Sequence, residues 1–208
     1  FTDFDDTWEW DGTSWLLRTP SVSPPPRSLH AIGYDPVRQR VVVFGGFDNA
    51  SNIHLSDTWE WDGTNWARVV TAHSPPPIGA SSLVRSLAFD RTRNRLTLFR
   101  NVTGEVWEYD GVDWSQVVAG SVPSGRWGGT LAADPLRGNC ILFGGFNHSA
   151  GMLGDTWTWD GSKWTQLTTA GTMPGRESHA MASRSAATAS SGRSVSAYRQ
   201  AALYLALA

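Results

Sequence analysis

The chain has 208 residues and a formal net charge of -2 at pH 7, and 17% of its residues are charged. This balance provides no strong positive field for nucleic acid or for an anionic membrane surface. The single cysteine, Cys140, excludes an internal disulfide and a zinc site built from several cysteines. No apolar run approaches the roughly 20 residues that span a bilayer. We therefore expect one moderate domain with no nucleic-acid partner and no membrane span.

Tryptophan is the residue type that stands out. Eleven of the 12 tryptophans lie in a phrase that occurs four times, as TWEWDGTSW (7–15), TWEWDGTNW (58–66), VWEYDGVDW (106–114) and TWTWDGSKW (156–164). The first tryptophans of the phrases are 51, 48 and 50 residues apart, at Trp8, Trp59, Trp107 and Trp157. A repeat of about 50 residues is the length of one four-stranded propeller blade. The phrase therefore predicts a repeat protein built of such blades.

In chain order, residues 1–18 supply only the third and fourth strands of a first unit, and residues 27–70 form a complete unit. The first strand of that unit covers 27–34 and ends in a turn at Pro36. The second strand contains VVVF, which is apolar throughout. We expect it to be buried on both faces.

The third strand of this unit, DTWEW, alternates between two faces. Its two tryptophans share one face and are expected in the core. Thr58 and Glu60 share the other face, where Glu60 is expected to contribute little to stability. Asp62-Gly63 then indicates a type I′ hairpin turn before the fourth strand.

Two further units follow, at 78–118 and 126–168. The motif VVVFGGF (41–47) returns as CILFGGF (140–146). The unit between them is degenerate, because LTLFRNV carries Arg100-Asn101 in place of the glycine pair. We expect looser backbone packing there.

The regular pattern ends after 174–182, which begins another first strand. Residues 183–208 are rich in Ser, Ala and Arg and contain no turn motif, glycine pair or apolar second strand. They are interpreted as an out-of-register tail, either frameshifted or unrelated, so the chain would be a truncated propeller with an incomplete or open ring. The alternative is a closed four-bladed ring in which the C-terminal segment completes the sheet begun by 1–18. An open ring would expose its terminal blades, and we expect self-association through them.

These units resemble kelch repeats, a propeller family marked by a glycine pair after the second strand and an aromatic pair downstream. Gly45-Gly46 and Gly144-Gly145 match the glycine pair. The resemblance covers residues 1–181, and the repeated phrase is most similar to the repeats of bacterial kelch-type proteins. It implies an all-β fold, a kelch-type β-propeller of about four blade equivalents, each of four antiparallel strands. We favour packing between blades over ligand stacking as the role of the repeated tryptophans.

Kelch blades also occur in galactose oxidase, which is a copper enzyme. A resemblance to that enzyme would require a cysteine cross-linked to a tyrosine, together with histidine and tyrosine ligands for copper. Cys140 lies in a second strand, and no tyrosine or histidine pair flanks it. His30 and His179 are interpreted as strand residues rather than ligands. We expect a binding or scaffold module with no metal, no cofactor and no catalysis of its own. The alternative is a fragment of a galactose oxidase-like, carbohydrate-active enzyme whose catalytic residues lie outside this chain.

Binding is expected on the face that carries the long loops between second and third strands, because function is concentrated in variable loops. The partner would be a protein or a glycan, in an extracellular or cell-surface setting. The candidate contact residues are Arg27, Arg126, Arg176, Trp127, Asn52, His54, Arg100, Asn147 and His148. The recurring arginines suit carboxylate recognition, although hydrogen bonding to neighbouring carbonyls is the favoured alternative. For Trp127, ordinary packing is favoured over ligand stacking.

Overall fold

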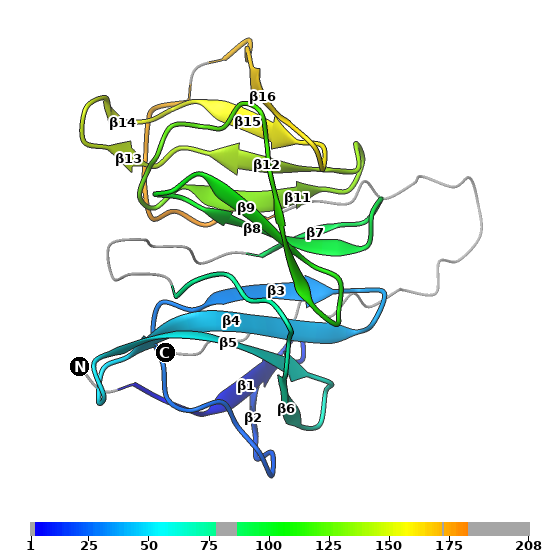
Figure 1. The fold of residues 1–208 in the computed structure, drawn as a ribbon. Helices are drawn as coiled ribbons and strands as arrows, with labels where there is room; N and C mark the ends of the chain where they lie inside the picture. The colour runs from blue at the N-terminus through cyan, green and yellow to red at the C-terminus, as the bar shows by residue number, and fades with distance from the viewer. Residues whose placement is uncertain (1–2, 78–86, 172, 183–208) are drawn as a thin grey trace.

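The computed structural model describes residues 3–77, 87–171 and 173–182, and all regular structure in these residues is β (Figure 1). The predicted all-β class is therefore confirmed. Within the described ranges, no helix is long and apolar enough to cross a membrane. The expectations for 78–86 and for the tail at 183–208 lie outside the described residues.

The strands form antiparallel sheets that follow one another along the chain. Sheet I consists of β1 (Thr7–Trp10) and β2 (Trp15–Arg18). Sheet II consists of β3 (Ala31–Asp35), β4 (Arg40–Asp48), β5 (Ile53–Trp61) and β6 (Trp66–Val69). Sheet III consists of β7 (Ala88–Asp90), β8 (Arg95–Arg100), β9 (Glu105–Tyr109) and β10 (Trp114–Val117). Sheet IV consists of β11 (Thr130–Asp134), β12 (Asn139–Phe143), β15 (Thr156–Trp159) and β16 (Trp164–Leu167). A small hairpin of β13 (Phe146–Asn147) and β14 (Gly151–Met152) lies between β12 and β15.

The sheets stack in chain order, with their faces packed together (Figure 1). The second strand of sheet II shows why, since its residues from Val41 to Phe44 are buried on both faces, as the apolar run predicts. Val41 and Val43 belong to the cluster that faces sheet I, whereas Val42 and Phe44 belong to the cluster shared with sheet III. Strand β7 contacts both β3 and β11, and the fourth strands are mainly exposed. The sheets therefore approach most closely at their first strands.

The tryptophan phrase joins neighbouring sheets by hydrogen bonds as well as by burial. Trp66 Nε1 donates to Thr7 Oγ1 at 2.8 Å, which links sheet II to sheet I. Trp114 Nε1 donates to Thr58 Oγ1 at 2.8 Å, which links sheet III to sheet II in the same way. Trp66 and Trp114 thus each satisfy the only polar group of the indole across the interface.

Glu60 takes part in the same interface, which argues against the expectation that it contributes little to stability. Glu60 accepts a hydrogen bond of 2.8 Å from Tyr109 Oη and forms an ion pair with Arg38. Burial, together with the bond to Glu60, raises the pKa of Tyr109 above its usual value and keeps its hydroxyl protonated as a donor. Alternation identified the face of the strand correctly, but that face is covered by sheet III rather than by water.

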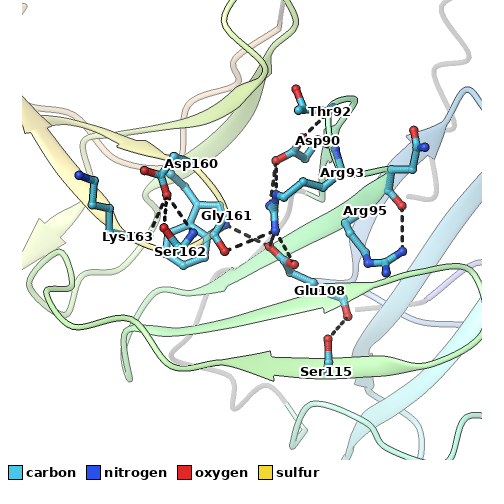
Figure 2. A network of polar contacts seen from close by, with 12 residues as sticks. Asp90, Thr92, Arg93, Arg95, Glu108, Ser115, Asp160, Gly161, Ser162 and Lys163 are labelled. Atoms are coloured by element: carbon cyan, nitrogen blue, oxygen red, sulfur yellow. Dashed lines mark hydrogen bonds and ion pairs between the residues drawn. The ribbon is translucent and has the colours of Figure 1, made fainter.

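Figure 2 shows the equivalent carboxylate of sheet III, Glu108, with Arg93, which also approaches Gly161 of sheet IV. Arg93 Nη1 donates to Glu108 at 2.7 Å, and Arg93 Nε donates to Asp90 at 2.9 Å. Glu108 also accepts from Trp159 Nε1 of sheet IV at 3.1 Å, and the carbonyl of Gly161 lies 3.5 Å from Arg93. A buried carboxylate held by arginine is therefore a repeated element of the stack.

The hairpin turn after the third strand differs from the predicted type I′ turn. Four residues, 62–65, connect the pair formed by Trp61 and Trp66. Asp62 Oδ1 accepts the N–H groups of Thr64 and Asn65 at 2.7 and 2.9 Å. A type I′ turn needs positive φ at both central residues. Of Asp62 and Gly63, only Gly63 has a positive φ, which is 96°. The aspartate side chain stabilises the longer turn instead.

The glycine pairs allow the second strand to pass close to the beginning of the first. Gly46 has a φ of 112°, and a Cβ at this residue would lie 2.7 Å from the carbonyl oxygen of Ser28. Sheet III carries Asn101 in this region, yet the expected looser packing is wrong. Asn101 is buried, its side chain donates to Gly129 O at 3.1 Å, and its carbonyl accepts from Arg126 N at 2.8 Å. Side-chain bonding thus organises the backbone without the glycine pair.

Candidate functional site

The connections between second and third strands lie on one side of the molecule, at the left in Figure 1. The tight turns between β3 and β4 and between β15 and β16 lie at the opposite ends of the strands, because antiparallel neighbours alternate their connections. The long loops of sheets II, III and IV are thereby gathered on one edge of the stack.

Three aromatic side chains meet at this edge of sheet IV. The Trp127 ring is stacked on Phe146, with centroids 6.0 Å apart and 26° between the planes. His148 points edge-on at Trp127, with centroids 4.1 Å apart, and lies 5.7 Å from Phe146. We call Trp127, Phe146 and His148 the aromatic cluster. These distances place the three rings in mutual contact.

Backbone bonds hold the aromatic cluster in place. Trp127 and Phe146 exchange two N–H to carbonyl hydrogen bonds, both of 2.8 Å. Asn147 Oδ1 accepts from Ser149 N at 2.8 Å, and Asn147 Nδ2 donates to Gly125 O at 2.6 Å. Asn147 therefore shapes the loop, and its amide is already engaged within the protein. His148 is exposed and the other two rings are half-buried.

Sheet II has the same backbone arrangement with different side chains. Ser28 and Phe47 exchange hydrogen bonds of 2.8 and 2.9 Å, as Trp127 and Phe146 do. His54 lies 4.8 Å from Phe47, ring to ring. A serine stands where sheet IV has tryptophan, so the indole is added to a frame that folds without it. This argues that Trp127 is not required to form the loop.

Arg27 and Arg126 are buried inside their sheets and are not available to a ligand. Each is 1% exposed. Arg27 pairs with both oxygens of Asp57 at 2.7 and 3.0 Å, and Arg126 pairs with Asp155 at the same two distances. Each also donates to the carbonyl of a glycine that follows the second strand. Both arginines therefore form hydrogen bonds within the fold, as the favoured alternative predicts, and each also pairs with a carboxylate.

Each carboxylate of these two pairs accepts hydrogen bonds from two side chains. Burial would raise the pKa of Asp57, but the bonds from Arg27 and from Trp59 Nε1, the latter of 2.7 Å, hold it below its usual value. Trp157 Nε1 donates to Asp155 at 2.6 Å in the same way. In sheets II and IV, the first tryptophan of the phrase thus anchors the carboxylate that holds the arginine.

The other candidates do not form a common site. Arg176 is exposed, its Nε donates to Pro174 O at 3.3 Å, and no described carboxylate forms an ion pair with it. Arg100 forms an ion pair with Glu105 in its own hairpin. Asn52 occupies a left-handed turn position with a φ of 56°. The structure therefore brings together Trp127, Asn147 and His148 alone, and adds Phe146, which follows the glycine pair and could have been identified from that position.

The described residues contain no group of three or more His, Cys, Asp and Glu side chains that could hold a metal ion. Cys140 is fully buried in the cluster between sheets III and IV. Burial raises the pKa of its thiol to about 12. Its position is that of a core residue.

No family model and no curated protein matches the chain. A solved structure described as "Structure of YjhT" matches with a TM-score of 0.56 and 16% sequence identity. The match covers 84% of this chain and 64% of the other, so this chain spans less than two thirds of that protein. At this identity the likeness concerns the fold alone.

Proposed function

We propose that the chain is part of a kelch-type β-propeller and acts as a binding module rather than as a catalyst. The proposal is supported by the repeat of about 50 residues, by the glycine pairs, and by sheets that approach one another at their first strands. Four-stranded sheets arranged radially around an axis are what a propeller requires. The alternative, a fragment of a carbohydrate-active enzyme, gains no support from the core position of Cys140.

The binding site is the aromatic cluster, and its ligand is a glycan. The observation that carries this proposal is the indole of Trp127, placed on a frame that sheet II builds with Ser28. The apolar C–H face of a sugar packs on an aromatic ring, and the exposed imidazole of His148 offers a hydrogen-bonding group beside it. The loop is held rigidly by backbone bonds, which lowers the entropy lost on binding.

A glycan array probed with the labelled chain tests the proposal. We expect binding to a defined set of glycans, with Trp127→Ala lowering the affinity for each hit at least about tenfold, as loss of a central aromatic contact does. Tyr34→Ala is the matched control, because Tyr34 is an exposed aromatic residue next to a tight turn on the opposite edge. It should leave binding unchanged. Circular dichroism establishes that both variants are folded.

Two results contradict the glycan proposal. One is a folded chain that binds no glycan on the array. The other is a set of hits that Trp127→Ala leaves unchanged. Binding to an immobilised protein that depends on Trp127 would keep the site but replace the ligand class.

A further inference from the structure

Every sheet of the stack has two unlike faces. One face carries the indoles that donate hydrogen bonds, such as Trp66 and Trp114, and we call it the donor face. The opposite face carries the acceptor hydroxyls of Thr7 and Thr58, and we call it the acceptor face. In the interfaces of sheets I to III, the donor face of the later sheet lies on the acceptor face of the earlier one. Stacking is therefore directional.

The donor face of sheet I is open. Trp15 occupies the position of Trp66, since each pairs with the last tryptophan of its third strand. Trp15 is 45% exposed, whereas Trp66 is 2% exposed. Among the described residues, none accepts a hydrogen bond from the indole N–H of Trp15 or of Trp10. Leu17 on the same face is also exposed.

The acceptor face of sheet IV is covered only in part, because His179 lies against Phe143 whereas Thr156 and Thr158 remain half-buried. Thr156 occupies the position of Thr58, because they pair with Phe143 and Phe44 in the same register. Thr58 is buried, whereas Thr156 is half-buried. On the same face, a depression of about 360 Å³ is lined in part by Ala132, Ile141 and Met181, and Ile141 pairs with Thr158.

A charged pair is also divided between the two ends. Asp6 holds Trp8 Nε1 at 2.7 Å, as Asp57 holds Trp59, but the other oxygen of Asp6 is buried without a hydrogen-bond partner. Arg176 stands two residues after Pro174, in the position of Arg27, and is exposed. Among the residues that the structure describes, Asp6 forms no ion pair with an arginine at one end of the stack, and Arg176 forms none with a carboxylate at the other.

We propose that copies of this chain stack end to end, with the donor face of sheet I of one copy on the acceptor face of sheet IV of the next. Trp15 Nε1 then bonds the Thr156 hydroxyl of the second copy, and Trp10 Nε1 bonds its Thr158 hydroxyl. Gly145 N donates to Arg176 O at 2.8 Å, which holds Arg176 on sheet IV and presents it to Asp6 of the neighbour. A second copy is the partner because it supplies both the indole donors and the missing charge. Such a contact joins unlike surfaces, so it produces rings or open chains rather than a two-fold dimer.

A mixing experiment tests this contact in the full chain. Sedimentation velocity should show that the mass of the wild-type chain rises with concentration. Trp15→Glu disables the donor face and Thr156→Glu disables the acceptor face, so each alone should raise the dissociation constant at least about tenfold. An equimolar mixture of the two should form a two-chain complex, because each variant keeps one intact end. Misfolding cannot produce this restoration. A wild-type monomer at all concentrations, association unaffected by either variant, or a mixture that stays monomeric overturns the proposal.

The divided charge pair gives an independent readout. Asp6→Arg or Arg176→Asp should weaken association, and the two changes in one chain should restore it. Restored thermal stability without any change in mass would mean closure within a single chain, and would overturn the proposal.

Thr158→Glu should tighten association about tenfold, since Glu9, Glu60 and Glu108 occupy this position in the other sheets and accept hydrogen bonds there. Gln166→Glu, at an exposed position on the opposite face of β16, is the control and should have no effect. Unchanged association in Thr158→Glu counts against the contact.

Discussion

The interface between sheets II and III and the interface between sheets III and IV place a tryptophan in the same way. Trp114 lies 5.0 Å from Phe44, ring to ring, and Trp164 lies 5.0 Å from Phe99. Both tryptophans are almost completely buried. The apolar contact is therefore the same in the two interfaces.

The two interfaces differ in one hydrogen bond. Trp114 Nε1 donates to Thr58 Oγ1, but Val106 stands at that position in sheet III and leaves Trp164 Nε1 buried without a hydrogen-bond partner. An unsatisfied buried N–H costs about 1–3 kcal/mol. The comparison teaches that ring packing alone positions the indole, and that the hydrogen bond adds stability to a geometry already determined.

Truncating either indole should have the largest effect. Trp114→Ala and Trp164→Ala should each lower the free energy of unfolding by about 3–5 kcal/mol, because a large aromatic side chain leaves a cavity. Trp114→Ala should be the more costly by about 1 kcal/mol, since it also leaves the Thr58 hydroxyl without its donor. Urea unfolding followed by circular dichroism measures both. Tyr34→Ala, at an exposed position outside both interfaces, is the control. A larger loss for Trp164→Ala than for Trp114→Ala would contradict the comparison.

Removing a bridging carboxylate should come next. Glu60→Ala leaves Arg38 and Tyr109 without their acceptor, and should cost about 2–3 kcal/mol, less than a fully buried pair because the arginine is partly exposed. Glu108→Ala should have a similar cost in the other interface. Gln116→Ala, on the exposed part of β10, should change the free energy of unfolding by less than about 0.5 kcal/mol. Equal small effects for all three in urea unfolding would show that the carboxylates are dispensable.

Repairing the weaker interface should have a smaller effect. Val106→Thr should stabilise the chain by about 1 kcal/mol, because its hydroxyl can accept from Trp164 Nε1. The mirror change, Thr58→Val, should destabilise it by about the same amount. The control is Val106→Thr combined with Trp164→Phe, which has no N–H to donate. Thermal melts showing the same gain in this background would refute the hydrogen bond as its cause.

The smallest expected effect concerns pH at the edge of sheet IV. Burial and the nearby charge of Arg176 lower the pKa of His179 below its usual value of 6.5. The folded state therefore favours neutral imidazole, and the stability that this segment gains is present above about pH 6.5 and is lost as pH falls below it. Ser178 N donates to Gly128 O at 2.9 Å and reports on the segment. Its hydrogen exchange, corrected for intrinsic rates, should accelerate between pH 7.5 and 5.5. In His179→Gln this pH dependence should disappear, and its persistence would assign it to another group.

Much of the fold could be predicted because its signals are local. The alternation in DTWEW, the apolar VVVF and the repeated phrase each follow from side-chain period and composition, and β4, β5 and β6 lie where they predict. The candidate site was less predictable. Trp127, Asn147 and His148 were identified one by one, but their meeting with Phe146 depends on a backbone bridge between residues distant in sequence.

The sequence by itself determined the strands, their order and the repeat, because these depend on neighbouring residues. The tertiary structure alone decided what each strand face meets. Glu60 and Arg27 are both polar residues that their local sequence would leave in water. Stacking buries Glu60 against Tyr109 of sheet III, and the assembly of sheet II buries Arg27 against Asp57. A buried charge is stable only beside its partner, and the partner is positioned by the packing of whole sheets. Polar roles at the interfaces therefore became visible only once the sheets were assembled.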